Sequence, residues 1–137
     1  MKATLLKFIM NIWPPFCGAG IKVKHIAKDY REVKVRMKLK WFNRNYVGTH
    51  YGGSLYSMVD PFYMLMLLHN LDKKYVVWDK SASIDFIAPG KGTVTAHFIL
   101  TEEQVEKIKN ETDSCGKYIA EFPIAIKDQN GDIVAKA

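Results

Sequence analysis

Residues 52–71 read GGSLYSMVDPFYMLMLLHNL and contain the longest apolar run of the chain, residues 62–68. Two glycines open the segment, and the apolar side chains that follow cover nearly the whole circumference of a helix. A helix that is apolar on all sides is buried inside a protein, and one sheet wrapped around it is an economical way to bury it. The apolar residues are Leu55, Tyr56, Met58, Val59, Phe62, Tyr63, Leu65, Met66, Leu67 and Leu68.

The clearest strand signal lies before this segment, in residues 33–41. Apolar residues there alternate with four cations, a pattern typical of a strand with one buried and one wet face. Residues 21–25 alternate in the same way, and a turn around Asp29-Tyr30 would join the two strands as a hairpin. Four more strands are predicted: in residues 75–88, 93–100 and 117–127, and after the Asn130-Gly131 turn. Pro123 would place its strand at an edge or a bulge.

Two further helices are predicted. Apolar residues recur at helical spacing in residues 5–13 and indicate an amphipathic helix that Pro14-Pro15 ends. A removed signal peptide is the alternative, but Lys7 interrupts the apolar region and no clear cleavage site follows. Thr101 and Gln104 form a capping-box pair at the start of a short helix.

These elements predict an α+β fold in a single domain of residues 1–137. Tight turns join the strands, so the sheet should be antiparallel. It would wrap around one long buried helix. Periodicity alone fits two such folds, the hotdog fold and the cone-shaped sheet of the nuclear-transport-factor type.

Composition is that of a soluble globular protein, with 48% apolar and 25% charged residues. No apolar stretch reaches the ~18 residues of a transmembrane helix. The net charge of +6 admits an anionic partner such as nucleic acid, a membrane or a phosphorylated ligand, and equally a solvated basic surface. Cys17 and Cys115 lack metal-binding spacing, so we expect no metal and two buried free thiols in a reducing cytoplasm.

The candidate chemistry lies around the glycines. The first N–H groups of a helix point outward at its positive end, where Gly52 and Gly53 could hold an anion or a developing oxyanion. Asp60 follows seven residues after Gly53, about two turns along the same face, and is the only acid of the segment. A buried lone carboxylate is typical of functional sites. Asp60-Pro61 is also a good helix start, with Asp60 as a structural cap.

Residues flanking the glycines have structural and functional interpretations. His50 is a hydrogen-bonded loop residue or a catalytic base. Asn45 orders the loop or binds a ligand carbonyl. Arg44 and Lys80 are solvated cations or phosphate contacts. Ser54 follows the glycines directly.

The segment from His50 to Asp60 resembles the phenylacetyl-CoA-type branch of hotdog thioesterases, which carries a His-Gly-Gly loop and an Asp seven residues beyond the second Gly. Tyr51, between His50 and the glycines, departs from that pattern. A second resemblance, to a largely uncharacterised bacterial hotdog family, covers nearly the whole chain. Members of that family are described as acyl-CoA thioesterases, and its domain also occurs fused to acetyltransferases. The matching segments are residues 13–16, 18–21, 43–49, 52–55, 60–64 and 78–80.

The resemblance implies a thioester hydrolase in which Asp60 activates water or attacks the thioester carbonyl. An N–H at Gly53 would polarise that carbonyl. At ~1.5 Å rise per residue the two residues lie about 10 Å apart on one helix, too far for one reaction centre. We therefore expect a site that combines Asp60 of one subunit with Gly53 of another, in a homodimer or a dimer of dimers. The expected substrate contacts are Arg44, Asn45, His50, Gly52, Ser54, Tyr63 and Lys80.

The expected substrate is an acyl-CoA or acyl-carrier thioester, with no cofactor beyond the coenzyme A of the substrate. No nucleic-acid or membrane partner is expected. Two other functions fit the same residues. One is a module that binds acyl thioesters without turnover, and the other is a hydratase or dehydratase that uses His50 with Asp60.

Overall fold

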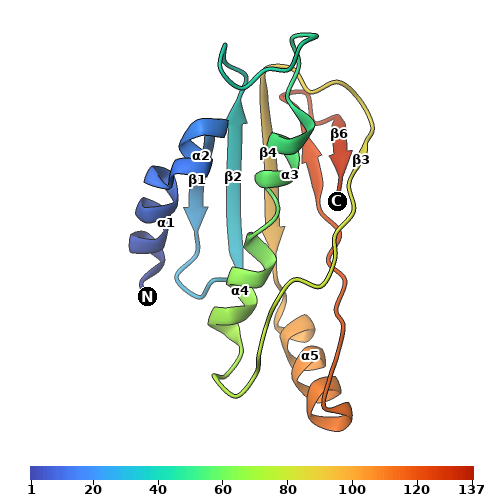
Figure 1. The fold of residues 1–137 in the computed structure, drawn as a ribbon. Helices are drawn as coiled ribbons and strands as arrows, with labels where there is room; N and C mark the ends of the chain where they lie inside the picture. Colours follow the sequence, from blue (N-terminus) through green and yellow to red (C-terminus); the bar gives the residue numbers. More distant parts are fainter.

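The computed structural model describes residues 1–137. Its centre is a six-stranded antiparallel sheet in the order β1-β2-β4-β5-β6-β3 (Figure 1). The number of strands and their antiparallel pairing confirm the prediction. The strands are β1 (Ile21–Ile26), β2 (Glu32–Lys38), β3 (Asp85–Phe86), β4 (Thr93–Ile99), β5 (Ala125–Lys127) and β6 (Ile133–Lys136).

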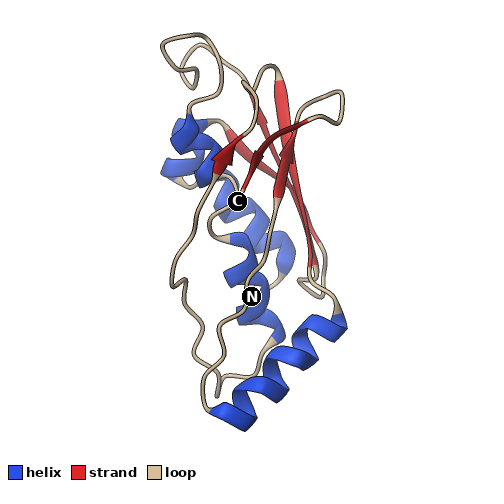
Figure 2. Ribbon diagram, turned by 90° about the vertical axis from the view of Figure 1, so that its right-hand side faces the viewer, coloured by secondary structure: helices blue, strands red, loops and turns tan.

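The central helices lie against one face of this sheet, and α5 extends below it (Figure 2). The capping box predicted for Thr101 and Gln104 is present at the start of α5, which is longer than expected. The hairpin turn before β6 is also confirmed, with Gly131 at φ 84°. The helices are α1 (Ala3–Ile12), α2 (Pro14–Ala19), α3 (Gly52–Ser57), α4 (Phe62–Asn70) and α5 (Glu102–Cys115).

The alternation in β2 matches its predicted faces. Val33, Val35 and Met37 are buried, while the cations between them are exposed. The strand ends at Lys38 rather than at residue 41, because the chain turns away there and leaves Trp41 81% exposed. The buried side of the sheet thus forms the core against which the central helices pack.

The central helix is not continuous, contrary to the prediction of one long buried helix. It consists of α3 and α4, and turn residues 58–61 separate them. Pro61 explains the break, since proline cannot donate the helical hydrogen bond to the Ser57 carbonyl. One face of both helices is buried through residues such as Leu55, Phe62 and Met66. The opposite face is not covered, and Leu68 is 46% exposed.

Two predicted strands are much shorter than the sequence indicated. Within residues 75–88 only β3 forms a strand, and within residues 117–127 only β5 does. The backbone bonds beyond them are few, from Ile87 and Ala88 to Val134 and between Ile124 and Ala137. Pro123 removes one ladder donor in the second segment. Their alternating apolar residues, among them Val77, Ile84 and Phe122, pack partly buried against the core without strand pairing. One-sided contact with a core therefore produced the same alternation as a strand.

The two edges of the sheet differ. At the β1 edge, the Asn11 side chain of α1 accepts from the Val23 N–H at 2.8 Å and donates to the Val23 carbonyl at 3.0 Å. The other edge is β3, whose only sheet partner is β6. Phe86 and the following Ile87 are 58% and 56% exposed there. One edge is therefore capped by the chain itself, and the other is open.

Candidate functional site

The loop before α3 is tied down by asparagines. Asn43 is buried and makes three hydrogen bonds, donating to the Ala19 and Lys38 carbonyls and accepting from the Lys40 N–H. The Asn45 side chain accepts from the N–H groups of Val47 and Thr49 and donates to the Thr49 hydroxyl. Asn45 thus has the loop-ordering role, and its amide is already occupied by the loop.

His50 anchors the end of this loop. Its ring is 3% exposed, with Nε2 2.8 Å from the Gly92 carbonyl oxygen. Nδ1 is buried without a partner. Burial lowers the pKa of His50, and the bond to Gly92 only partly opposes this, so the neutral ring with Nε2–H donating is favoured. In a single chain His50 is a buried anchor that makes no hydrogen bond to the exposed carboxylate of Asp60.

The glycines at the start of α3 allow close contacts. A Cβ on Gly52 would lie 2.9 Å from the Phe86 ring of β3, and one on Gly53 would lie 2.5 Å from the Tyr51 ring. Neither glycine N–H donates a backbone hydrogen bond, as is usual in the first turn of a helix. No side chain caps this turn. The amides on which the oxyanion prediction rests are therefore free, and they lie beside the open edge of the sheet.

Asp60 is exposed in the single chain, contrary to the prediction that it is buried. The reason is that the chain leaves the outer face of α3 and α4 uncovered. Asp60 does not cap α4 either, since the N-cap position is Pro61 and no side chain bonds to the first turn. The capping interpretation of Asp60 is therefore wrong.

The Asp60 carboxylate is held by Tyr56, whose hydroxyl donates to Oδ1 at 2.8 Å. This hydrogen bond, with burial and the charges of Asp60 and Asp79, raises the pKa of Tyr56. The pKa of Asp79, an exposed residue, is raised as well, first by partial desolvation and then by the negative charge of Asp60. Tyr56 and Asp79 therefore form an acidic cluster with Asp60.

Sequence reasoning had not assigned Tyr56 or Asp79 to the site. The spacing of Tyr56 and Asp60, four residues apart, is that of side chains on one helical face and could have indicated the contact. Asp79 lies in a matching segment of the family resemblance, but no local pattern links it to Asp60.

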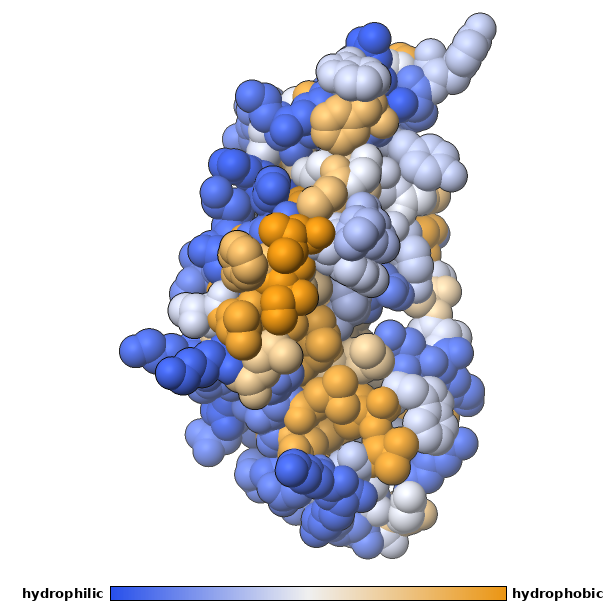
Figure 3. All heavy atoms as spheres, turned by 60° about the vertical axis from the view of Figure 1, so that its left-hand side comes forward, coloured by the Kyte–Doolittle hydropathy of each residue, from blue (hydrophilic) through white to orange (hydrophobic).

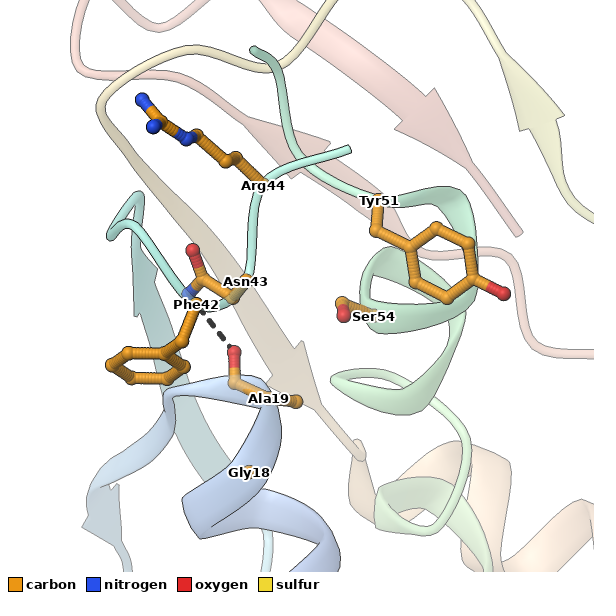
Figure 4. A pocket seen from close by; sticks show the side chains of 7 residues that line it. All are labelled: Gly18, Ala19, Phe42, Asn43, Arg44, Tyr51 and Ser54. Carbon is orange, nitrogen blue, oxygen red and sulfur yellow. Dashed lines mark hydrogen bonds between the residues drawn. The ribbon is translucent and has the colours of Figure 1, made fainter. Parts of the chain in front are cut away.

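A pocket of about 350 Å³ lies between the end of α2 and the start of α3 (Figure 4). It brings together two of the predicted residues, Arg44 and Ser54. Ser54 faces Asn43 and Ala19 across the space, and the Arg44 side chain points away from it. The remaining lining residues are Gly18, Phe42 and Tyr51.

The other predicted substrate contacts lie elsewhere. Tyr63 packs in the core against Phe98 and Phe122, and it lines a second pocket of about 330 Å³ beside β4 and β5. Burial raises the pKa of Tyr63. Lys80 is exposed and forms no salt bridge. One chain therefore places the candidate residues in several separate regions and not around one centre.

Solved structures resemble this arrangement over most of its length. The Pseudomonas aeruginosa protein PA5026, described as a probable thioesterase of unknown function, matches with a TM-score of 0.81 and 22% identity, covering 99% of this chain and 91% of that one. The Haemophilus influenzae thioesterase HI1161 matches with a TM-score of 0.68 and 12% identity, covering 99% and 85%.

A mutant of the phenylacetic acid degradation protein PaaI from Thermus thermophilus matches with a TM-score of 0.60 and 19% identity, covering 90% of this chain and 92% of that one. No curated protein sequence matches the chain. These likenesses define the class of fold, and the chain is a hotdog-fold protein.

The family is defined as well. The model of the family described as "Domain of unknown function (DUF4442)" matches residues 1–137, and the chain belongs to this family.

Proposed function

We propose that the protein hydrolyses acyl thioesters, with acyl-CoA as the substrate. The observation that carries the proposal is the acidic cluster. A carboxylate at a helix break, held by Tyr56 and lying on an uncovered face, can reach a substrate. The thioesterases among the structurally similar proteins support the same reaction class.

In this proposal Asp60 acts as a base on water or attacks the thioester carbonyl directly. The Tyr56 hydroxyl occupies Oδ1 and fixes the carboxylate, leaving Oδ2 for the water or the carbonyl carbon. The free N–H of Gly53 stabilises the negative charge that develops on the carbonyl oxygen. On the base route, Asp60 takes a proton from the water and passes it to the departing coenzyme A thiolate. On the nucleophilic route, attack by Asp60 expels the thiolate and forms an acyl anhydride, which a water then hydrolyses while supplying the thiol proton. Coenzyme A leaves as the thiol on either route, and the reaction needs no further cofactor.

The active form is a homodimer joined at the open edge of the sheet. An exposed strand edge with apolar side chains pairs readily with another chain, and the β1 edge is already capped. The contact of Gly52 with Phe86 puts the glycine amides at this open edge. Asp79, which interacts with Asp60, lies in the segment that leads into β3. A second copy can therefore bring its glycines toward Asp60.

The rest of the substrate would occupy the surroundings of these groups. Arg44 and Lys80 are exposed cations that can contact the phosphates of coenzyme A. Ser54 and the pocket beside it offer space next to the glycine amides. Cys17 and Cys115 are exposed and free, where buried thiols were expected. Free thiols and an acyl-CoA substrate both fit the reducing cytoplasm.

The direct test is hydrolysis of a panel of acyl-CoA chain lengths by the wild type and by Asp60→Ala. We expect turnover by the wild type and at least a ~100-fold loss in the variant, since a positioned base or nucleophile is removed. Undiminished hydrolysis in Asp60→Ala would place the chemistry elsewhere. Acyl-CoA binding by calorimetry without turnover at any chain length would favour the binding module.

A further inference from the structure

The outer face of α1 is apolar and exposed to solvent. Leu5, Phe8, Ile9 and Ile12 recur at the i, i+3, i+4, i+7 spacing of one helical face and are 50%, 60%, 40% and 59% exposed. Trp13 continues the stripe and is 45% exposed. Leu5, Ile9, Ile12 and Trp13 underlie the prediction of an amphipathic helix, but the structure turns them outward.

The fold itself does not use this face. The opposite side of α1 packs on the sheet, where Ala3 and Met10 are buried and Asn11 caps the β1 edge. The helix is therefore apolar on two opposite faces, and only one is needed to hold it in place. Isolated exposed apolar residues are ordinary, but a contiguous stripe with an aromatic end marks an interaction surface.

The N-terminal segment that contains the stripe is rich in lysine. Residues 1–28 contain five lysines and no acid. Lys22 and Lys24 lie exposed on β1, next to α1, and Lys22 is paired across the sheet with Arg36. Like charges directly opposite each other destabilise a sheet, so an anionic partner would relieve this pair. Figure 3 shows an orange apolar patch bordered by blue hydrophilic surface on the side of α1.

We propose that α1 docks on an anionic lipid surface, with the stripe from Leu5 to Trp13 in the interface and the lysines of residues 1–28 at the headgroups. Apolar and aromatic residues on one side of a helix with flanking lysines are the features of helices that lie in a membrane interface. None of the helices is both long and apolar enough to cross a bilayer. The proposal replaces the expectation of no membrane partner.

A second copy of the chain fits this face less well. A symmetric dimer presents the same patch from both subunits. A dimer joined through α1 would bring together the lysines of residues 1–28 from both subunits. Neither subunit has an acid in residues 1–28 that could pair with them. Anionic headgroups supply the missing charge, and the acyl region accepts the apolar stripe.

The test is co-sedimentation of the full chain with phosphatidylcholine vesicles, prepared with and without phosphatidylglycerol. We expect binding only to the anionic vesicles, and a loss of ~10-fold or more in the double variant Phe8→Glu, Ile12→Glu. The control is the double variant Val76→Glu, Ile119→Glu, which introduces the same added charge at two exposed apolar residues outside α1. The control should bind like the wild type.

A second readout uses Trp13 alone. In a Trp41→Phe, Trp78→Phe background, the emission of Trp13 should shift to shorter wavelength on addition of the anionic vesicles. Several results would overturn the proposal: wild type that binds neither vesicle or both equally, a double variant that binds like its control, or α1 substitutions that change the oligomeric state. Binding of nucleic acid without binding of vesicles would equally assign the basic surface to another partner.

Discussion

The negative charge of Asp60 acts on the carboxyl group of Asp79, and the charges of both residues act on Tyr56. Folding raises the pKa of Asp79 because the surrounding atoms desolvate its charged form and Asp60 repels it. An acid with a raised pKa favours folding at low pH, where it is protonated. That contribution is lost as the pH rises through the folded-state pKa of Asp79.

The substitution Asp79→Asn should therefore raise the melting temperature at pH 7, where the wild-type carboxylate is charged. At about pH 3, below the ordinary pKa of aspartate, the two proteins should melt together. The gain in melting temperature from Asp79→Asn should be smaller in an Asp60→Asn background, since the repulsion between the two carboxylates is already absent there. Calorimetry of the four proteins at both pH values measures this. An equal gain in both backgrounds would show that the two carboxylates do not interact.

For single residues, it is easier to predict from the sequence which positions are important than to predict the role of each. The loop role of Asn45 was among the interpretations that the sequence offered, whereas the close packing of the glycines against aromatic rings appears only in the structure. Asn43 was not assigned, because one of its hydrogen-bond partners lies 24 residues away in the chain. Asp60 was expected to be buried, because a sequence does not say which helix face the same chain will cover.

The junction of α2 with β1 depends on a close contact. Gly20 has φ 76°, and a Cβ there would lie 2.6 Å from Nδ2 of the buried Asn43. Gly18, in α2 itself, has no atom within 4 Å of its would-be Cβ. The two glycines are therefore a matched pair, one required by the structure and one free.

We expect Gly20→Ala to lower the free energy of unfolding by ~2 kcal/mol or more, from backbone strain and displacement of the Asn43 amide. Gly18→Ala should be neutral or stabilise by up to ~1 kcal/mol, since alanine favours the helix. Urea unfolding followed by circular dichroism measures both. Similar effects of the two substitutions would contradict the role given to the Gly20–Asn43 contact.

At the scale of elements, the sequence predicted β1, β2 and β4 well, because their alternation reflects two sheet faces. It overestimated the length of the strands around β3 and β5. A segment that runs along the core with one side buried shows the same alternation of apolar and polar residues as a strand. The break between α3 and α4 could be anticipated from Pro61. The sequence pattern could not distinguish a bent helix from two helices.

For the whole molecule, the open β3 edge and the uncovered face of α4 predict a dimer. Ile87→Lys places a charge on that edge and should convert the protein to monomers with loss of thioester hydrolysis. Ile119→Lys, at a residue outside β3 that is 50% exposed, is the matched control and should remain dimeric and active. Sedimentation velocity measures whether each variant is a monomer or a dimer. A monomeric wild type, or a dimer that tolerates Ile87→Lys, would contradict this interface.

The class of fold could be predicted from the sequence because one apolar helix and alternating strands restrict the packing to few arrangements. The complete site could not, since a single chain carries Asp60 and free glycine amides without a common centre. The proposed reaction therefore requires residues from two chains.

Complementation between two inactive variants tests this most directly. Gly53→Pro removes the N–H within the first helical turn, where proline is tolerated. Proline and alanine both add a Cβ that must displace the exposed Tyr51 ring, so Gly53→Ala, which keeps the N–H, controls for that displacement. Asp60→Asn and Gly53→Pro should each abolish acyl-CoA hydrolysis as homodimers. After unfolding and refolding together in equal amounts, half of the dimers are mixed, and each has one intact site. The account predicts recovery of about a quarter of wild-type activity. No recovery in proven mixed dimers would show that Asp60 and Gly53 do not act across the interface.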